Sequence, residues 1–530
     1  MSNRTPGAAI DDRVTDDQVL EGFGYRPELR RTLRPWAVFG IAFSFMSITT
    51  SVYTVFGFGL GKFGTASVWF WLPVFAGQIL IALVLAELGS RIPLAGYSYQ
   101  WGSRLISPGY GWVIAAVAFV YLLTSVATIT YVLIGPFIGS MFGITLSSLQ
   151  TLLIALGALI LIAIVNILGV RLFARINNVA VVAEIVASLF IAIAVLIVVF
   201  AKNGHAMSLG NTGGVHGGAV WPGIEGALAV GLFSLTGFET AADMSEEAVG
   251  AAGNVPRAVI GSLVVSGTVG FIALVCFAVA TPNIAAIAGS SSPVFDIITH
   301  WFGSTLARIL LIFPLFAVFG TALAVVAVQG RLLFALARDN IAPGSTLLRR
   351  VNGHTRTPVA AILVGTILSA AVLLYAYEQS SAFTVLVGAT AILPYVVYLM
   401  LIVAYAVRRR ALSTLHAPGT YSLGRWAVPV FTLSFAWLLF ALWVLTVPSD
   451  FHKADGVVGG VLVLAVLWYL VVLRRRISSG RAGTGHLSDP TTVSDLSSAT
   501  PERPPTRDSQ ESVADQLPAS ALPPPDEDRR

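Results

Sequence analysis

Charge is scarce in this sequence. Of its 530 residues, 11% are charged and 56% are apolar, whereas a soluble globular domain carries about 25% charged residues. So few charges cannot cover the water-exposed surface of a soluble chain of this length. The composition therefore predicts an all-α polytopic membrane protein whose apolar surface lies in the lipid bilayer.

Reactive thiols and metal ligands are equally scarce. The only cysteine, Cys276, lies within an apolar run, which excludes an internal disulfide and a thiolate-bound metal cluster. The seven histidines fall in expected loops or the tail without His-x-x-x-His spacing, so we expect no metal and no cofactor. Gly57–Lys62 lacks the Ser or Thr that follows the lysine of a phosphate loop.

The net charge of +5 does not indicate a nucleic acid partner, because the positive charge lies beside the apolar runs. With a cytoplasmic amino terminus, nearly all arginines between these runs fall on the inner side, whereas Lys62, Lys202 and Lys453 fall outside. This bias predicts that both termini are cytoplasmic and that the chain is a multi-pass protein of the cytoplasmic membrane.

Twelve apolar stretches reach or approach the length of about 20 residues that a membrane-spanning helix needs. Residues 1–34 are expected to form a polar cytoplasmic segment without a signal peptide, and 35–475 are expected to contain the spans. Residues 476–530, rich in Pro, Ser, Thr and acids, are predicted to be a disordered cytoplasmic tail. The expected spans are 37–60, 66–88, 110–134, 149–169, 178–201, 223–243, 258–281, 305–335, 359–377, 383–407, 426–447 and 456–473.

Spans one and six have the least lipid-like centres. Hydroxyl residues gather between Ser44 and Ser51, and polar or small residues gather between Ser234 and Thr240. The two spans cross in opposite directions, and paired interrupted helices of this kind are typical of inverted-repeat secondary transporters. A helix start inside the membrane favours an anion such as a carboxylate. The alternative is that these small residues only permit close helix packing.

Four segments resemble those of amino acid–polyamine–organocation (APC) superfamily permeases, within the amino acid/choline transporter branch. They are Phe43–Tyr53, Ala86–Trp101, Gly237–Ala248 continued by Asn254–Val259, and Gly330–Pro343. The resemblance spans about residues 20–475. It implies a five-plus-five inverted repeat over about 37–201 and 223–407, with helices one and six broken, and two further helices over about 426–473.

The same resemblance implies a substrate site at the two breaks. Backbone groups of the first break would hold the substrate carboxylate, and carbonyl groups of the second would hold its amino group. Many relatives have a glycine-rich triplet where this chain has Thr49-Thr50-Ser51. Carried over to this chain, the substrate-binding positions are Ile48, Thr49, Thr50, Ser51, Leu235, Thr236, Gly237 and Phe238.

Two acids within apolar spans are candidates for ion coupling or gating. Glu184, expected at the inner end of span five, is interpreted as a proton carrier or cation ligand, or else as a hydrogen-bonded packing carboxyl. Glu239 is interpreted as a site or gate residue, or as a satisfied structural acid. Asp243, Glu246 and Glu247 are expected in a solvated inner loop. Tryptophans at span ends, including Trp71 and Trp101, are expected in the interfacial belt.

The expected function is secondary active import of an amino acid or related amine by alternating access. We expect a coupling ion, with a proton favoured over sodium. Transport or exchange of choline, ethanolamine, GABA or a polyamine by the same fold stays open. A channel would need a continuous polar pore, and an enzyme would need a nucleophile, a base or a metal constellation, so neither is favoured.

Overall fold

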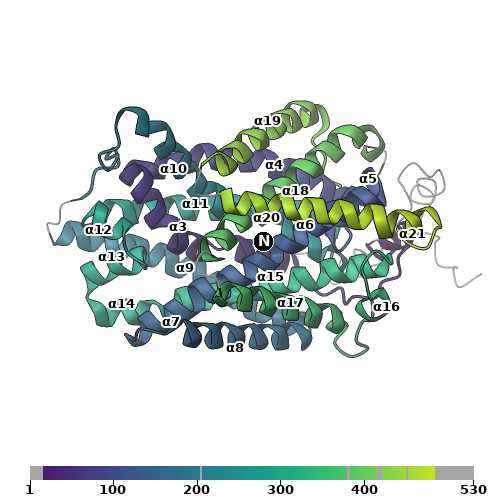
Figure 1. Cartoon of the computed structure of the whole chain (residues 1–530), viewed down its shortest axis with the longest axis horizontal. Coiled ribbons are helices and arrows are strands. Elements are labelled where there is room, and N and C mark those ends of the chain that lie inside the picture. The colour runs from purple at the N-terminus through teal and green to yellow at the C-terminus, as the bar shows by residue number, and fades with distance from the viewer. Residues whose placement is uncertain are drawn as a thin grey trace, which may run out of the picture.

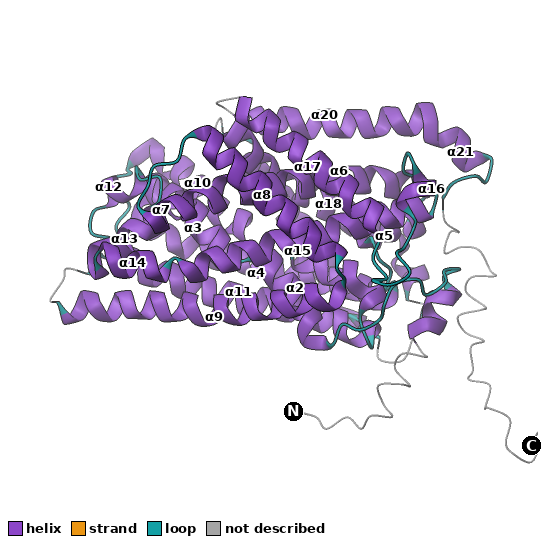
Figure 2. Ribbon diagram, turned by 90° about the horizontal axis from the view of Figure 1, so that it is seen from below, coloured by secondary structure: helices purple, strands orange, loops and turns teal. Residues whose placement is uncertain are grey.

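Helices form the scaffold of the protein, as its composition predicts. The structure, a computed structural model, describes residues 16–202, 206–378, 382–413, 415, 420–448 and 452–483. No strand occurs within those ranges (Figure 2), although one isolated bridge pairs Leu33 with Ala248. The predicted all-α polytopic fold is confirmed.

The described residues contain 11 stretches that are long and apolar enough to cross a membrane. The first, Pro35–Arg91, has 57 residues and would extend about 85 Å as one straight helix, nearly three times the hydrocarbon thickness. It is divided into α2 (Pro35–Met46), α3 (Ile48–Phe63), the 3₁₀ segment η1 (Gly64–Phe70) and α4 (Trp71–Arg91). These cover predicted spans one and two, and the other stretches match the remaining ten.

The remaining helices pack into one bundle. Figure 1 shows α12, α13 and α14 at one end of it, and α5, α16 and α21 at the opposite end. The elements are α5 (Tyr97–Leu105), α6 (Pro108–Ala127), π-helical η2 (Thr128–Ile134), α7 (Gly135–Phe142), α8 (Ser148–Ile167), α9 (Val170–Ala201), η3 (Gly217–Ala219), α10 (Val220–Ser234), η4 (Phe238–Glu247), α11 (Ala251–Val279), α12 (Ile284–Ala288), α13 (Pro293–Phe302), α14 (Ser304–Leu310), α15 (Ile312–Arg338), α16 (Ser345–Leu348), α17 (Val359–Glu378), α18 (Ala382–Leu412), η5 (Gly424–Trp426), α19 (Ala427–Thr446), α20 (His452–Trp468), η6 (Tyr469–Leu473) and α21 (Arg474–Ser478).

Helix α9 has one exposed apolar face and one face that is buried in the bundle. Val182, Val186 and Phe190 are 50–62% exposed, whereas Val181 and Glu184 are almost fully buried. Exposed apolar side chains at a spacing of four residues form a stripe on one side of a helix. A stripe of this size in contact with water would be costly, and it is the surface that lipid covers in a membrane protein.

Two sequence predictions about positions are wrong. Helix α9 begins at Val170 rather than at 178, so Glu184 lies near its middle and not at its inner end. Trp71 and Trp101 are buried rather than interfacial. Their indole N–H groups donate to backbone carbonyls within the bundle, over 2.8 Å and 2.9 Å respectively. Both indoles can be buried because each N–H group has a carbonyl acceptor.

The amino-terminal segment 16–34 packs under the bundle. Thr32 and Leu33 donate their N–H groups to the carbonyl of Glu247, over 2.9 Å and 2.8 Å. At the other end of the chain, Gly483 N–H donates to the carbonyl of Asp339. The predicted disordered tail begins inside α21, and its residues 484–530 lie outside the described residues, so its disorder stays a prediction.

Candidate functional site

The first helix break lies at Ser47, between α2 and α3. Ser47 has φ 29° and ψ 103°, a left-handed conformation that is uncommon for a residue other than glycine. Its hydroxyl oxygen accepts a hydrogen bond from Thr50 N–H over 3.1 Å and so caps the start of α3. Backbone held in such a conformation costs about 1–3 kcal/mol, and it is concentrated at functional sites.

The carboxyl group of Glu184 lies at this break. Its Oε1 accepts from the Ser47 hydroxyl over 2.6 Å and from Thr49 N–H over 3.0 Å. Its Oε2 has no hydrogen-bond partner among the described residues, and the residue is 1% exposed. The salt bridges within the described ranges do not include Glu184. The start of α3, whose dipole is equivalent to about half a positive charge, is therefore the positive group that faces this carboxyl group.

The second helix break lies between α10 and η4. Helix α10 ends at Ser234, and Gly237 has φ 101°. A Cβ atom at Gly237 would overlap the ring of Phe45 in α2, so the position requires glycine for both its conformation and its close approach. The two breaks thus meet at the Phe45 ring, although they are far apart in the sequence.

Two tyrosines of α18 satisfy the backbone groups that the second break leaves free. The Tyr395 hydroxyl donates to the carbonyl of Leu232 over 2.9 Å. The Tyr398 hydroxyl accepts from Gly237 N–H over 3.1 Å and donates to Glu239 Oε2 over 2.6 Å. Unwound backbone inside a membrane needs such partners, and α18 provides them.

Glu239 connects three elements directly after the second break. Besides Tyr398 of α18, it accepts a hydrogen bond from the hydroxyl of Tyr97, at the start of α5, over 3.3 Å. Glu239 is fully buried. These hydrogen bonds must break before η4, α5 and α18 can separate at this point.

A small polar cavity lies between the two breaks. Its volume is about 50 Å³, and nine of its fourteen lining side chains carry a hydroxyl group. Thr128 lines it with a buried hydroxyl that has no partner among the described residues. This volume accommodates only a few water molecules, so the cavity is too small to hold an amino acid. The lining residues are Phe45, Met46, Thr50, Ser51, Thr54, Tyr121, Ser125, Thr128, Ile129, Phe233, Thr236, Thr321, Val325 and Thr390.

A second, partly polar pocket, of about 340 Å³, lies between the middle of α3, α7 and the start of α13. Thr54 lines both this pocket and the central cavity. Figure 1 shows α12 and α13 at the end of the bundle opposite to α5, the helix that supplies Tyr97. The central cavity is thus bordered by a polar pocket on one side and by the Glu239 cluster on the other.

The predicted site residues fall into three groups. Thr50, Ser51 and Thr236 line the central cavity. Ile48 and Thr49 lie on the opposite face of α3, beside Glu184. The other three, Leu235, Gly237 and Phe238, are buried in or directly after the second break.

The comparison with known proteins agrees with this architecture. The family model described as "Amino acid permease" matches residues 33–472, which include both breaks and the cavity. The chain belongs to the amino acid permease family. This family membership makes it a transporter rather than an enzyme and confirms the resemblance found in the sequence.

Related permeases cover most of the chain at low identity. An uncharacterized amino-acid permease of Schizosaccharomyces pombe is 22% identical over 91% of this chain and 90% of its own length. A GABA-specific permease of Saccharomyces cerevisiae is 26% identical over 87% of this chain and 85% of its own length. A putative polyamine transporter of Candida albicans is 22% identical over 90% and 91%, respectively.

The acids that follow Glu239 are buried in this permease, so the prediction that they lie in a solvated loop is wrong. Asp243, Glu246 and Glu247 are at most 3% exposed, because η4 carries them beneath α15. Arg331 forms a salt bridge with Glu247, and Arg338 forms one with Glu246, each over 2.8 Å. The spacing of these arginines by seven residues, two helical turns, is a signal that could have indicated the pairing.

Asp243 is the acid that the sequence interpretation missed. Neither carboxyl oxygen has a hydrogen-bond partner among the described residues, and the residue is fully buried. It lies one helical turn beyond Glu239 in the sequence, on the same segment η4. A buried acid without a partner costs several kcal/mol, so Asp243 joins Glu184 and Glu239 as a titratable candidate in the permease.

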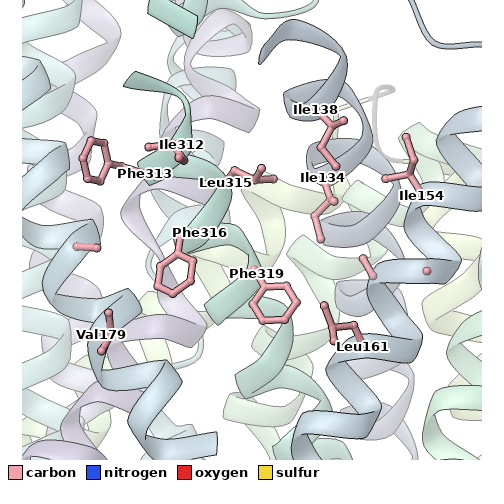
Figure 3. A pocket seen from close by; sticks show the side chains of 13 residues that line it. Ile134, Ile138, Ile154, Leu161, Val179, Ile312, Phe313, Leu315, Phe316 and Phe319 are labelled. Carbon is pink, nitrogen blue, oxygen red and sulfur yellow. The ribbon is translucent and has the colours of Figure 1, made fainter. Parts of the chain in front are cut away.

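A larger, apolar cavity has no place in this polar site. It has a volume of about 620 Å³ and is lined by apolar residues of η2, α7, α8, α9 and α15. Figure 3 shows Phe316, Phe319 and Leu161 directed into it. A cavity without a hydrogen-bonding side chain cannot recognise a zwitterion, so we exclude it as the substrate site of the permease.

Proposed function

We propose that this permease imports an amino acid or a related amine across the cytoplasmic membrane by alternating access, with the substrate bound between the Ser47 and Gly237 breaks. The contact of Gly237 with Phe45, beside a cavity lined by hydroxyl groups, is the observation that carries this proposal. Two helix breaks at one cavity present both N–H and C=O groups to a ligand, as a zwitterion requires.

The proposed mechanism uses a five-plus-five inverted repeat, about 37–201 and 223–407, followed by two helices at about 426–473. In this proposal the inner side is closed, and the hydrogen bonds of Glu239 with Tyr97 and Tyr398 support that assignment. The polar pocket that shares Thr54 with the cavity provides the outer path. Import then requires closure of that path and separation of the Glu239 cluster.

The proposed coupling ion is a proton carried by Glu184. Within the described residues, the buried Glu184 carboxyl has one oxygen without a hydrogen-bond partner and is paired with no cation, so that oxygen has room to take up a proton. Protonation during the cycle would therefore change the charge at the first break. Sodium is the second candidate, because the buried oxygen atoms of Ser44 and Asn177 also lack partners among the described residues.

The substrate proposal is supported by the names of the relatives. One is described as specific for GABA and another as a putative polyamine transporter, and both ligands carry a primary amine. For this chain we propose an amine-bearing substrate, either an amino acid or a polyamine. Choline or ethanolamine transport, and exchange rather than symport, are the alternatives of the same fold.

Uptake by purified permease in liposomes tests this function. A panel of radiolabelled amino acids, GABA, putrescine and choline is offered under an imposed inward proton gradient and, separately, a sodium gradient. We expect saturable accumulation of one substrate class that collapses when a protonophore removes the proton gradient. Equilibration without accumulation would indicate a channel or facilitator, and accumulation driven by sodium alone would overturn the proton assignment.

Three variants assign the roles of the acids. Glu184→Gln is expected to bind and exchange substrate but not to concentrate it, because a fixed neutral side chain cannot carry a proton. Glu239→Gln is expected to speed downhill efflux, because it weakens the hydrogen bonds that Glu239 accepts from Tyr97 and Tyr398. Glu225→Gln is the matched control, since Glu225 is a buried acid of α10 that lines neither the cavity nor the Glu184 crevice. Proton-driven accumulation by Glu184→Gln would contradict the coupling role.

A further inference from the structure

The start of α3 presents two different faces to two different sites. On one face, Thr49 and Tyr53 line a narrow crevice with Glu184 and Ser188 of α9. On the other face, Thr50, Ser51 and Thr54 line the central cavity. The two sites therefore share the N–H groups and the positive dipole end of one helix turn.

The hydroxyl group of Ser47 connects these two faces. It donates to Glu184 Oε1 over 2.6 Å and at the same time accepts from the N–H of Thr50 over 3.1 Å. Ser47 is fully buried, so water does not compete for either bond. A change in the charge of Glu184 changes the strength of its hydrogen bond with the Ser47 hydroxyl. This in turn changes the hydrogen bond that the same hydroxyl accepts from Thr50 N–H, at a residue that lines the cavity.

One helix start cannot neutralise two carboxylates. Its dipole is equivalent to about half a positive charge, and Glu184 already uses it. The crevice around Glu184 contains no Lys or Arg, and its lining residues from α11 and α15 are apolar: Ala273, Phe277, Phe313 and Pro314. Tyr53 is the other titratable side chain that lines the crevice, and a tyrosine remains neutral in the physiological range.

We infer that the start of α3 serves two carboxylates in alternation, that of Glu184 and that of the substrate, with the Ser47 hydroxyl as the link between them. A substrate carboxylate in the central cavity would be a second anion at the same helix turn, repelled by ionised Glu184. Uptake of one proton from solution at Glu184 Oε2, which has free lone pairs, removes that repulsion. The buried Thr128 hydroxyl, which lacks a partner, is a further donor for the incoming ligand.

This inference rests on the proposed function and makes it more specific in two respects. The substrate class becomes amines that carry a carboxylate, rather than polyamines. One proton accompanies each carboxylate, because the two negative charges exclude one another at one site. Ser47 acts as a positioning residue, since in this arrangement it affects the ligand through Thr50 N–H.

Equilibrium binding to the purified permease, measured from pH 5.5 to 8.5, tests this inference with two matched ligand pairs. GABA is compared with propylamine, and ornithine with putrescine, because the members of each pair differ only by the carboxylate. We expect the Kd of the carboxylate-bearing member to rise with pH, by up to tenfold per pH unit, as binding requires an added proton. The Kd of the amine without a carboxylate should stay constant or fall, because ionised Glu184 attracts a cation.

Variants of the first break separate the link from general stability. Ser47→Gly removes the hydroxyl but tolerates φ 29°. In this variant, the factor by which the Kd of GABA rises per pH unit should be at least threefold smaller than in the wild type. Glu184→Gln should remove that dependence. Ser434→Ala is the control: it deletes a fully buried serine hydroxyl of α19 that donates within its own helix over 2.8 Å and lines neither site, and it should keep the wild-type pH profile.

Each outcome of this experiment is informative. Tight binding of putrescine with no binding of GABA or ornithine would overturn the carboxylate assignment while leaving transport of amines intact. If carboxylate binding is independent of pH, or its pH dependence is unchanged by Ser47→Gly, the inference that two carboxylates share the start of α3 is wrong. Absence of binding to all four ligands, with uptake of none of the panel, would overturn the proposed function and this inference with it.

Discussion

The guanidinium carbon of Arg338 lies 3.6 Å from the centre of the Tyr25 ring. The hydroxyl group of the same tyrosine donates to both carboxyl oxygens of Asp339, over 2.9 Å and 3.0 Å. Arg338 also forms a salt bridge with Glu246 of η4. Tyr25 thus connects the amino-terminal segment to the carboxyl-terminal end of α15 and, through Arg338, to η4, the segment that carries the proposed gate residue Glu239.

Removal of the Tyr25 side chain should loosen the inner side of the permease. Tyr25→Ala loses the cation–π contact and the hydrogen bonds, together worth about 1.5–3 kcal/mol, whereas Tyr25→Phe keeps the ring. In a Cys276→Ser background, a cysteine at the buried position Ser245 reports inner opening by its reaction with a small thiol reagent. We expect about tenfold faster labelling for Tyr25→Ala and a smaller change for Tyr25→Phe. Equal rates in all three would contradict a closing role.

The effect of Tyr25 should not depend on pH. Burial raises the pKa of Tyr25 to about 12, so the group keeps its proton and its role as a donor to Asp339. A tyrosine whose pKa is raised on folding loses this stabilisation only as pH rises from about 10 towards 12. The labelling ratio of Tyr25→Ala to the wild type is therefore expected to be the same at pH 6 and pH 8.5, in contrast to the pH-dependent binding expected from Glu184.

The broken helices could be predicted from sequence because their signal is local. Thr50 and Gly237 stand among small and polar residues at the centre of apolar runs, where a continuous lipid-facing helix would carry Leu, Ile or Val. The lengths of the spans were predictable for the same reason. The start of α9 at Val170 was missed because its first turns carry arginines and asparagines, which remain helical beyond the apolar run.

The partners of the buried acids could not be predicted. Ser47 and Glu184 are 137 residues apart, and Tyr398 and Glu239 are 159 apart, so their pairing depends on how the spans pack. Asp243 looked like part of a charged loop because the sequence does not show that η4 continues beneath α15. A charge density that is typical of solvated segments is here compensated by Arg331 and Arg338.

Gly237→Ala should abolish uptake. The added methyl group would overlap the Phe45 ring, and φ 101° is strained for any residue with a Cβ atom. We expect a loss of stability of at least about 2 kcal/mol, seen as a lower thermal midpoint, together with loss of substrate binding. Gly261→Ala in α11 is the control, because its Cβ would meet Phe39 at an ordinary 3.8 Å. Normal uptake by Gly237→Ala would place the substrate away from the second break.

Tyr398→Phe should make the permease leaky. It leaves Gly237 N–H and Glu239 Oε2 without the Tyr398 hydroxyl, at a cost of about 1–3 kcal/mol for each buried group. We expect faster downhill efflux of preloaded substrate from liposomes and weaker accumulation. The control is Tyr405→Phe, on the same helix, because its partner Glu87 keeps a salt bridge with Arg91 over 2.9 Å. Efflux that is equal in the two variants would contradict a gate at Glu239.

The orientation of the chain in the membrane is tested with two glycine positions chosen for their surroundings. Gly218 and Gly353 are exposed, neither has a left-handed φ, and a Cβ at either would meet no atom within 4 Å. Single cysteines placed there in a Cys276→Ser background should therefore preserve the fold. The arginine bias places Gly218 outside and Gly353 in the cytoplasm, so an impermeant thiol reagent on intact cells should label only Gly218→Cys. Labelling of Gly353→Cys under the same conditions, without lysis, would reverse the proposed orientation and the direction assigned to the Glu239 gate.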